Sequence, residues 1–369
     1  MRAIYIWQHK NWTDFHWDEK RVLPLLCEVR NMQGKVAGTF SMIGFEVRNI
    51  AALEAMTQDV IMSSDIEGER LRTDSVRSSL AKQLRLPYEG LLESDHYIDG
   101  VVEISMDAVN NYKEPLTAER LFDWHAALFP YGRSGACKIT VANWRQGEDA
   151  MLIVSGAMGK ERVHYQAPDS DDVPKEMEKF LDWFNRDTQI DSVVKAAMAH
   201  LWFVAIHPFD DGNGRLARSI TDLLMARSDD MPHRYYSLSV EIRERRKEYY
   251  EVLEKTTCGN SDITEWLLWF LNCLKSAMEK SLQKISRTLE KTKFWDKHFD
   301  TPVNERQRKI INMLWDGFDG KLNTSKWAKI CKCSQDTALR DIHDLIAKGI
   351  LRQTDEGGRS TNYVLCEKD

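Results

Sequence analysis

Residues 193–218 read VVKAAMAHLWFVAIHPFDDGNGRLAR, and this stretch decides the fold around it. Its first half, 193–206, is almost uninterrupted apolar sequence, which is typical of a buried central helix. The helix is expected to stop at His207, because the residue before a proline disfavours the helical region. Apolar periodicity returns in 216–226. The sequence therefore predicts a helix, a glycine loop and a second helix.

The loop itself has the composition of an anion site. Gly212 and Gly214 allow positive φ and close approach of a ligand to the backbone. They lie just before a helix, where free N–H groups and the positive end of the helix dipole favour a phosphate. Arg215 and Arg218 are three residues apart, so they share one helix face and can both reach phosphate oxygens.

Two further residues of the loop add chemistry. Asp211 offers a hard oxygen ligand, through which Mg²⁺ would bridge the carboxylate and the phosphates. His207 is the nearby group that can take a proton near neutral pH. A capped turn with surface charges is the alternative, but it requires neither of these side chains. The pattern therefore indicates phosphoryl or nucleotidyl transfer.

Outside this stretch the chain reads as mainly α-helical. Phe45, Leu53, Met56 and Val60 recur at helical spacing, as one buried helix face would. The other expected elements, in chain order, are helices at 95–112 and 117–129, a β-hairpin pairing 151–155 with 161–166, a helix beginning near Pro174, and one long helix over 262–298. His125, on the apolar stripe of 117–129, is interpreted as a packed core histidine.

Composition excludes several classes of protein. The chain has 369 residues, enough for two or three domains, and its 43% hydrophobic and 29% charged residues exclude a disordered chain. A net charge of -6 argues against a globally basic nucleic-acid coat. No run of about eighteen apolar residues predicts a membrane span, and the first residues do not resemble a signal peptide. The seven scattered cysteines are expected to be free thiols, so we expect a cytoplasmic protein.

The loop sequence His207–Arg218 resembles the Fic-domain family, because it matches the family motif H-P-F-x-[DE]-G-N-G-R-x-x-R at every fixed position. The resemblance extends over about residues 40–290. It implies the helical Fic fold and a protein adenylyltransferase, which moves AMP from ATP to a Ser, Thr or Tyr hydroxyl of a target protein or of itself. A Fic relative that phosphorylates its target has Lys at the first arginine of the motif, whereas this chain has Arg215.

The resemblance also implies roles for single residues. His207 would deprotonate the target hydroxyl, Asp211 would hold Mg²⁺, and Phe209 would point inward and fix the loop. Phosphate contacts would come from the Asn213 side chain and from the backbone or side chains of Gly212, Asn213, Gly214, Arg215 and Arg218, the last binding the γ-phosphate. Either Tyr249 or Tyr250 would touch adenine, and some relatives have an adenine-binding Asn near Thr257, where this chain has Thr and Cys.

The predicted hairpin also fits the family pattern. In the family a β-hairpin flap pairs with the backbone of the target, and Ile153, Val154, Val163 and Tyr165 occupy that hairpin here.

Upstream, Ser63-Ser64-Asp65-Ile66-Glu67-Gly68 matches the inhibitory motif [ST]-x-x-x-E-[GN]. The resemblance implies that Glu67 forms a bidentate pair with Arg218, that Ser63 holds Glu67, and that the misaligned ATP reacts slowly. In some relatives this glutamate instead removes AMP from the target, and the sequence leaves that alternative open.

The last part of the chain resembles a winged helix-turn-helix domain, with three helices and a strand pair whose tip is Gly357-Gly358. Residues 301–369 contain twelve Lys/Arg and ten Asp/Glu, a net charge of +2, which is low for a DNA-binding module. We therefore favour protein contact or dimerisation over DNA binding. A nucleotide-sensing DNA-binding regulator and a homodimer remain open alternatives.

These patterns predict four parts. They are an N-terminal helical region with the inhibitory motif (1–100), a Fic catalytic domain (101–275), a helical connector (276–300) and the winged helix-turn-helix domain (301–369). ATP and Mg²⁺ are the expected substrate and cofactor.

Overall fold

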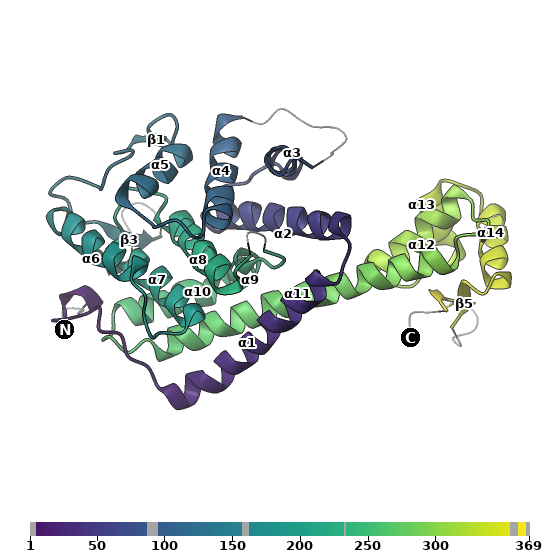
Figure 1. The fold of residues 1–369 in the computed structure, drawn as a ribbon. Helices are drawn as coiled ribbons and strands as arrows, with labels where there is room; N and C mark the ends of the chain where they lie inside the picture. Colours follow the sequence, from purple (N-terminus) through teal and green to yellow (C-terminus); the bar gives the residue numbers. More distant parts are fainter. Residues whose placement is uncertain (1–4, 87–94, 157–161, 232–233, 355–360, 367–369) are drawn as a thin grey trace. The chain divides into compact units, whose positions relative to one another are not determined.

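The computed structural model describes residues 5–86, 95–156, 162–231, 234–354 and 361–366 (Figure 1). The predicted turn of the hairpin at 157–161 and the glycine pair Gly357-Gly358 lie outside the described residues. The described part is mainly helical, as the sequence predicts, and its strands form only two-stranded sheets.

The chain divides into two compact units, residues 1–281 and residues 282–369. The expected regions 1–100 and 101–275 both fall inside the first unit. The expected connector 276–300 is largely covered by the end of one long helix, α11 (Thr264–Lys297), which contributes residues to both units.

The first unit contains most of the helices. Besides the first part of α11, they are η1 (Ile6–Gln8), α1 (Glu19–Ser41), α2 (Phe45–Ile66), α3 (Thr73–Gln83), α4 (His96–Asn110), α5 (Ala118–Leu128), η2 (Ser170–Asp172), α6 (Val173–Asn185), α7 (Ser192–Ile206), α8 (Asn213–Asp229), α9 (Leu238–Glu244) and α10 (Arg246–Thr257).

Helices α7 and α8 form the centre of this unit. Asp191 caps α7 by accepting the N–H of Val193 at 2.9 Å, and nearly every side chain of the helix is buried. The two helices make the most extensive helix–helix contact among the described elements, and they lie side by side in Figure 1. Because the buried pair is joined by a short loop, the loop is fixed at both ends.

Helix α2 approaches this pair with its C-terminal half and packs on α3, α8 and α9. Leu53, Met56 and Val60 are buried, as the helical spacing predicts. Phe45 was expected on the same face, but 69% of it is exposed, because it is the first residue of the helix and lies beyond the packed part. The buried end of α2 thus leads the following residues towards α8.

The predicted hairpin is present as β3 (Leu152–Ser155) and β4 (Arg162–Gln166). The strands are antiparallel, with Leu152 opposite Gln166 and Ser155 opposite Arg162, and the register shifts between Ile153 and Val154. A second, shorter pair, β1 (Arg133–Ser134) and β2 (Cys137–Lys138), follows α5.

The second unit has its own core. Helices α12 (Glu305–Gly317), α13 (Thr324–Cys331) and α14 (Gln335–Ala347) are followed by the antiparallel strands β5 (Leu351–Gln353) and β6 (Tyr363–Leu365). Fully buried side chains from all three helices meet there, including Ile310, Trp327 and Ile342. Ser334 caps α14 by accepting the N–H of Thr337.

Two acidic residues of α14 are paired inside this unit. Asp341 accepts from both Nε and Nη2 of Arg306, at 2.7 and 3.0 Å, and Asp344 accepts from Gln307 and Lys348. The low net charge of the unit stands, but these pairs reduce the repulsion that the two aspartates would exert on a nucleic-acid backbone.

Within the described ranges, none of the helices combines the length and the apolar character that crossing a bilayer requires.

Candidate active site

The loop between α7 and α8 is held by its own side chains. His207 ends α7 in the left-handed conformation, with φ 52°. Phe209 is fully buried and stacks on His125, with ring centroids 4.2 Å apart, so the inward orientation expected for Phe209 is confirmed. The side-chain amide of Asn213 bonds both the N–H and the C=O of Phe209, at 3.0 and 2.8 Å. Asn213 therefore fixes the loop with its side chain, and the side-chain contact to phosphate that we expected would break these bonds.

The two loop glycines leave room that no other residue would leave. Gly212 precedes α8 with φ +83°, and a Cβ on it would lie 2.9 Å from the ring of Phe129. A Cβ on Gly214 would overlap Oε1 of Glu67 and would lie 3.3 Å from Nη1 of Arg218. A carboxylate oxygen thus already lies against the helix N-terminus, where free N–H groups favour an anion.

Arg218 is almost fully buried and is held by the end of α2. Its Nη2 donates to Oε1 of Glu67 and to the carbonyl of Ser63, both at 2.8 Å, and its Nε donates to the hydroxyl of Ser63 at 2.8 Å. The expected pair is present, but it is not bidentate, because two of the donors are taken by Ser63. Ser63 accordingly holds Arg218, and not Glu67 as we expected. Nη1 of Arg218 is buried without a hydrogen-bond partner among the described residues.

Arg215 has partners that sequence reasoning missed. Its Nη1 donates to Oε2 of Glu69 at 2.9 Å and to the hydroxyl of Tyr97 at 2.7 Å. Its guanidinium also lies over the ring of Phe129, 5.1 Å from the centroid. No sequence pattern singled out Glu69 or Tyr97, so nothing in the sequence pointed to these partners of Arg215.

Asp211 lies on the same loop, with both carboxylate oxygens bonded. Oδ1 accepts the N–H of Gly212 at 2.6 Å, and Oδ2 accepts the hydroxyl of Ser134, which the sequence did not single out. Its backbone carbonyl is 3.2 Å from Nε2 of His125. The described residues contain no group of three or more His, Cys, Asp or Glu that could hold a metal ion. A single carboxylate fits Mg²⁺, which keeps several waters and takes its remaining ligands from phosphates.

The ring of His207 is held in one orientation. Its Nδ1 lies 3.3 Å from the carbonyl of Val204, so Nδ1 carries the proton and Nε2 offers a lone pair. Burial lowers the pKa of His207 to about 4, which keeps the ring neutral near pH 7. Arg145, which sequence reasoning missed, donates from Nε to the carbonyl of His207 at 2.8 Å and from its backbone to Pro208. The ring is therefore a neutral base on a fixed backbone.

The two tyrosines of α10 differ in what they can bind. Tyr249 is buried, and its hydroxyl bonds Nε2 of His200 at 2.8 Å, so it is a core residue and is withdrawn from the expected adenine contacts. Tyr250 is 38% exposed, and its hydroxyl lies 3.4 Å from Oε2 of Glu67. Tyr250 is thus the tyrosine that remains available to a ligand at the loop.

Two segments of the chain match models of known families. Residues 115–225 match the model of the Fic/DOC family, and residues 5–86 match a domain of unknown function, DUF4172. The chain carries a Fic domain. The Fic match includes the loop, its histidine and both arginines, whereas Glu67 lies in the segment that matches the second model.

Named relatives agree with the Fic match. The protein adenylyltransferase Fic of Nematostella vectensis is 25% identical over 237 residues, which are 63% of this chain and 50% of that protein. The protein adenylyltransferase fic-1 of Caenorhabditis elegans is 39% identical over 90 residues, 24% of this chain and 16% of that protein. The chain therefore spans half or less of the length of these relatives.

Solved structures agree on the fold. A Fic family protein from Desulfovibrio desulfuricans G20 matches with a TM-score of 0.55 and 20% identity, over 94% of this chain and 95% of the other. A Fic domain containing signaling protein from Bacteroides thetaiotaomicron VPI-5482 matches with a TM-score of 0.51 and 18% identity, over 69% and 94% of the two chains. The predicted Fic helical fold is confirmed.

The hairpin of the Fic domain offers fewer exposed residues than expected. Val154 and Val163 are exposed, and Ile153 is partly exposed. Tyr165 is only 4% exposed, because its hydroxyl donates to the carbonyl of Ala205 at 2.8 Å and its ring fills the core. Tyr165 therefore fixes the hairpin to the end of α7 and cannot face a target.

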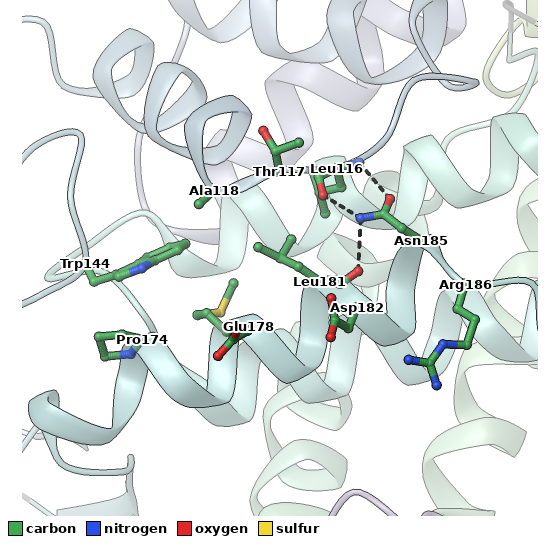
Figure 2. Close-up of a pocket in the computed structure, with 11 residues that line it drawn as sticks. Leu116, Thr117, Ala118, Trp144, Pro174, Glu178, Leu181, Asp182, Asn185 and Arg186 are labelled. Carbon is green, nitrogen blue, oxygen red and sulfur yellow. Dashed lines mark hydrogen bonds between the residues drawn. The ribbon is translucent and has the colours of Figure 1, made fainter.

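The hollow in Figure 2 is a separate feature of the Fic domain. It has a volume of about 630 Å³ and is lined by residues of α6, by the chain entering α5 and by the residue that follows α6, including Thr117, Leu181 and Arg186. Asn185, also on its wall, bonds the backbone of Leu116. None of the loop residues 207–218 lines it, so the chemistry of the loop does not involve this hollow.

Proposed function

We propose that this chain is a protein adenylyltransferase held in a low-activity state by Glu67. The observation that carries the proposal is the carboxylate of Glu67, which lies against Gly214 and is bonded to Arg218. An anion therefore already occupies the position where the loop would bind a phosphate of ATP. The names of the relatives support AMP as the transferred group.

In the proposed reaction the target hydroxyl oxygen attacks the α-phosphorus of ATP. The new O–P bond forms as the bond from the α-phosphorus to the bridging oxygen breaks, and pyrophosphate leaves. Nε2 of His207 takes the proton of the hydroxyl, because Nδ1 is committed to Val204. The loop N–H groups and Arg215 would stabilise the phosphate charge. Mg²⁺ held by Asp211 would neutralise the leaving pyrophosphate.

Glu67 inhibits this reaction by competing for Arg218. While Arg218 is bonded to Glu67, it cannot bind the γ-phosphate, so the α-phosphate is wrongly aligned for attack. A misplacement of about 1 Å is enough to lower the rate about a hundredfold.

The first test compares four proteins incubated with ATP and Mg²⁺: the wild type, Glu67→Gly, His207→Ala and the variant that combines both substitutions. We expect Glu67→Gly to raise AMP transfer about a hundredfold, including transfer to the protein itself. The combined Glu67→Gly/His207→Ala variant should be inactive. Intact mass reports the gain of one AMP, and radioactive ATP reports the rate. Unchanged labelling of Glu67→Gly would refute inhibition by Glu67.

Removal of AMP from a target is the second candidate. It is favoured by the Glu67 side chain, which is 31% exposed and whose Oε2 has one long contact, 3.4 Å to the hydroxyl of Tyr250. Such an oxygen could orient a water molecule. Incubating AMP-modified Glu67→Gly protein with the wild type separates the candidates, because only an AMP-removing enzyme would restore the unmodified mass.

For the second unit we propose a winged helix-turn-helix that contacts protein, and DNA binding stays the alternative. Gln335 and Arg340 are exposed on α14, as a recognition helix would require, but Asp336 is exposed beside them. A gel shift at several salt concentrations distinguishes the two, since binding to DNA weakens steeply with salt.

A further inference from the structure

Both arginines of the loop are bonded to carboxylates of one short segment. Residues 67–69, which we call the 67–69 turn, follow the end of α2 and contain Gly68 with φ +89°. Glu67 holds Arg218, as described above. On the other side of Gly68, Glu69 holds Arg215, at 2.9 Å between Oε2 and Nη1.

The second pair is part of a small closed network. Tyr97, on the first turn of α4, donates its hydroxyl to Oε2 of Glu69 and accepts from Nη1 of Arg215 at 2.7 Å. Arg215 is only 4% exposed and is covered on one face by Phe129. The guanidinium therefore has a defined position, and Glu69 and Tyr97 both bond the same nitrogen of it.

The network lies beside the expected phosphate position of the loop. Arg215 lies on the first turn of α8, one residue after Gly214, where the expected phosphate would bind. A phosphate oxygen and the carboxylate of Glu69 are both acceptors, so they compete for the N–H groups of one guanidinium. Residue 69 also brings a second negative charge to a site that must accept a polyanion.

We propose that Glu69 and Tyr97 form a second latch, which keeps Arg215 from the nucleotide phosphates independently of the Glu67–Arg218 pair. The inference rests on the proposed function, in which Arg215 contacts phosphate. The two latches act on different quantities. Glu67 controls the alignment and hence the turnover rate, whereas Glu69 controls the affinity for ATP. When Glu67 alone is removed, Glu69 still bonds Arg215. Nucleotide binding therefore stays weaker than in a variant that lacks both carboxylates.

The test measures nucleotide affinity without turnover. The full chain is titrated calorimetrically with the α,β-methylene analogue of ATP and Mg²⁺, because the bond that AMP transfer breaks is blocked in this analogue. The variants are Glu69→Gln, Tyr97→Phe, Glu67→Gly and Glu67→Gly/Glu69→Gln. Glu54→Gln is the matched control, since it removes an equal charge from α2, where Glu54 faces Arg77 instead of the loop.

We expect Glu69→Gln to lower the Kd about tenfold, the scale of one charge-assisted hydrogen bond, both in the wild type and in Glu67→Gly. Tyr97→Phe should lower the Kd by less, because the carboxylate remains, and Glu54→Gln should leave it unchanged. In AMP transfer, Glu69→Gln added to Glu67→Gly should lower the KM for ATP about tenfold with kcat unchanged. Thermal melting confirms that each variant is folded.

An unchanged or raised Kd in Glu69→Gln overturns the second latch, since Glu69 would then position Arg215 for the phosphate. This failure differs from a failure of the proposed function. If the analogue binds to none of the variants, including Glu67→Gly, the loop is not a nucleotide site and the adenylyltransferase proposal falls together with the latch.

Discussion

Single residues of the loop each have more than one close contact. His207 is held through its Nδ1 and through its carbonyl, so both its ring and its backbone are fixed. Gly214 is defined by what surrounds it, a carboxylate oxygen and an arginine nitrogen, and not by its φ. Two predictions follow from these surroundings.

The first concerns the pH dependence of AMP transfer. Because burial lowers the pKa of His207 to about 4, the ring stays neutral, and competent as a base, at every pH well above that value. The rate of Glu67→Gly at saturating ATP should therefore be level from pH 8 to pH 6 and should fall only as the pH approaches 4. A loss of half the rate near pH 6.5 would contradict the geometry. Circular dichroism at each pH confirms that the protein is folded.

The second concerns Gly214. Gly214→Ala places a methyl group on the position of the Glu67 oxygen and close to Arg218, so we expect binding of the ATP analogue to be lost. Gly38→Ala, inside α1, is the control, because a Cβ there meets nothing within 4 Å and a helical Ala is about 1 kcal/mol more favourable than Gly. Equal calorimetric affinities of the two variants for the ATP analogue would show that the backbone at Gly214 does not hold phosphate.

At the scale of elements, the hairpin is fastened to α10. Glu254 accepts from Nη2 of Arg162 at 2.5 Å and lies 2.6 Å from Nδ1 of His164, both on β4. These pairs, together with the Tyr165 contact to Ala205, hold a two-stranded hairpin that would be only marginally stable by itself. Since Tyr250 lies one helical turn before Glu254, the hairpin proposed to bind the target and the proposed nucleotide site both involve α10.

We predict that Glu254→Gln loosens the hairpin and leaves the central helices unchanged. Amide hydrogen exchange in β3 and β4 should become about tenfold faster, the effect of losing one charge-assisted contact, while exchange in α7 stays the same. Glu251→Gln on the same helix is the control, because its pair with Lys247 is exposed and contributes little. Similar exchange in the two variants would mean that Glu254 does not hold the hairpin.

At the scale of the whole molecule, the chain carries two cores. The second unit buries large side chains of its own, among them Trp315 and Trp327, whereas the loop residues 207–218 of the proposed nucleotide site belong to the first unit. The two activities proposed for the chain, AMP transfer and contact with a partner, thus belong to separate cores.

We predict that the second unit can be destabilised while the first unit stays folded. Trp327→Ala removes a fully buried side chain and should destabilise the second unit by about 3–5 kcal/mol. In calorimetric unfolding, one transition should move to lower temperature, while the other should still be stabilised by the ATP analogue. Loss of the nucleotide-induced stabilisation would show that the first unit depends on the second.

The sequence predicted the features that depend on neighbours along the chain. The apolar run 193–206, the proline after His207 and the glycines before α8 are local signals, and the structure has the helices where these signals place them. The hairpin strands and the long helix α11 followed in the same way. These features were predictable because helix periods, turn residues and capping are set within a few residues. The inward Phe209 was implied by the family resemblance.

What only the tertiary structure decided is which distant groups meet. Glu69 and Arg215 are 146 residues apart, Tyr97 and Arg215 are 118 apart, and the packing of α2 and α4 on α8 brings them together. The exclusion of Tyr249 and Tyr165 from binding has the same origin, since each hydroxyl found a partner in the core. A spacing in sequence specifies which face of one helix a side chain occupies, but the partner on that face depends on how separate helices pack, and no local period encodes that.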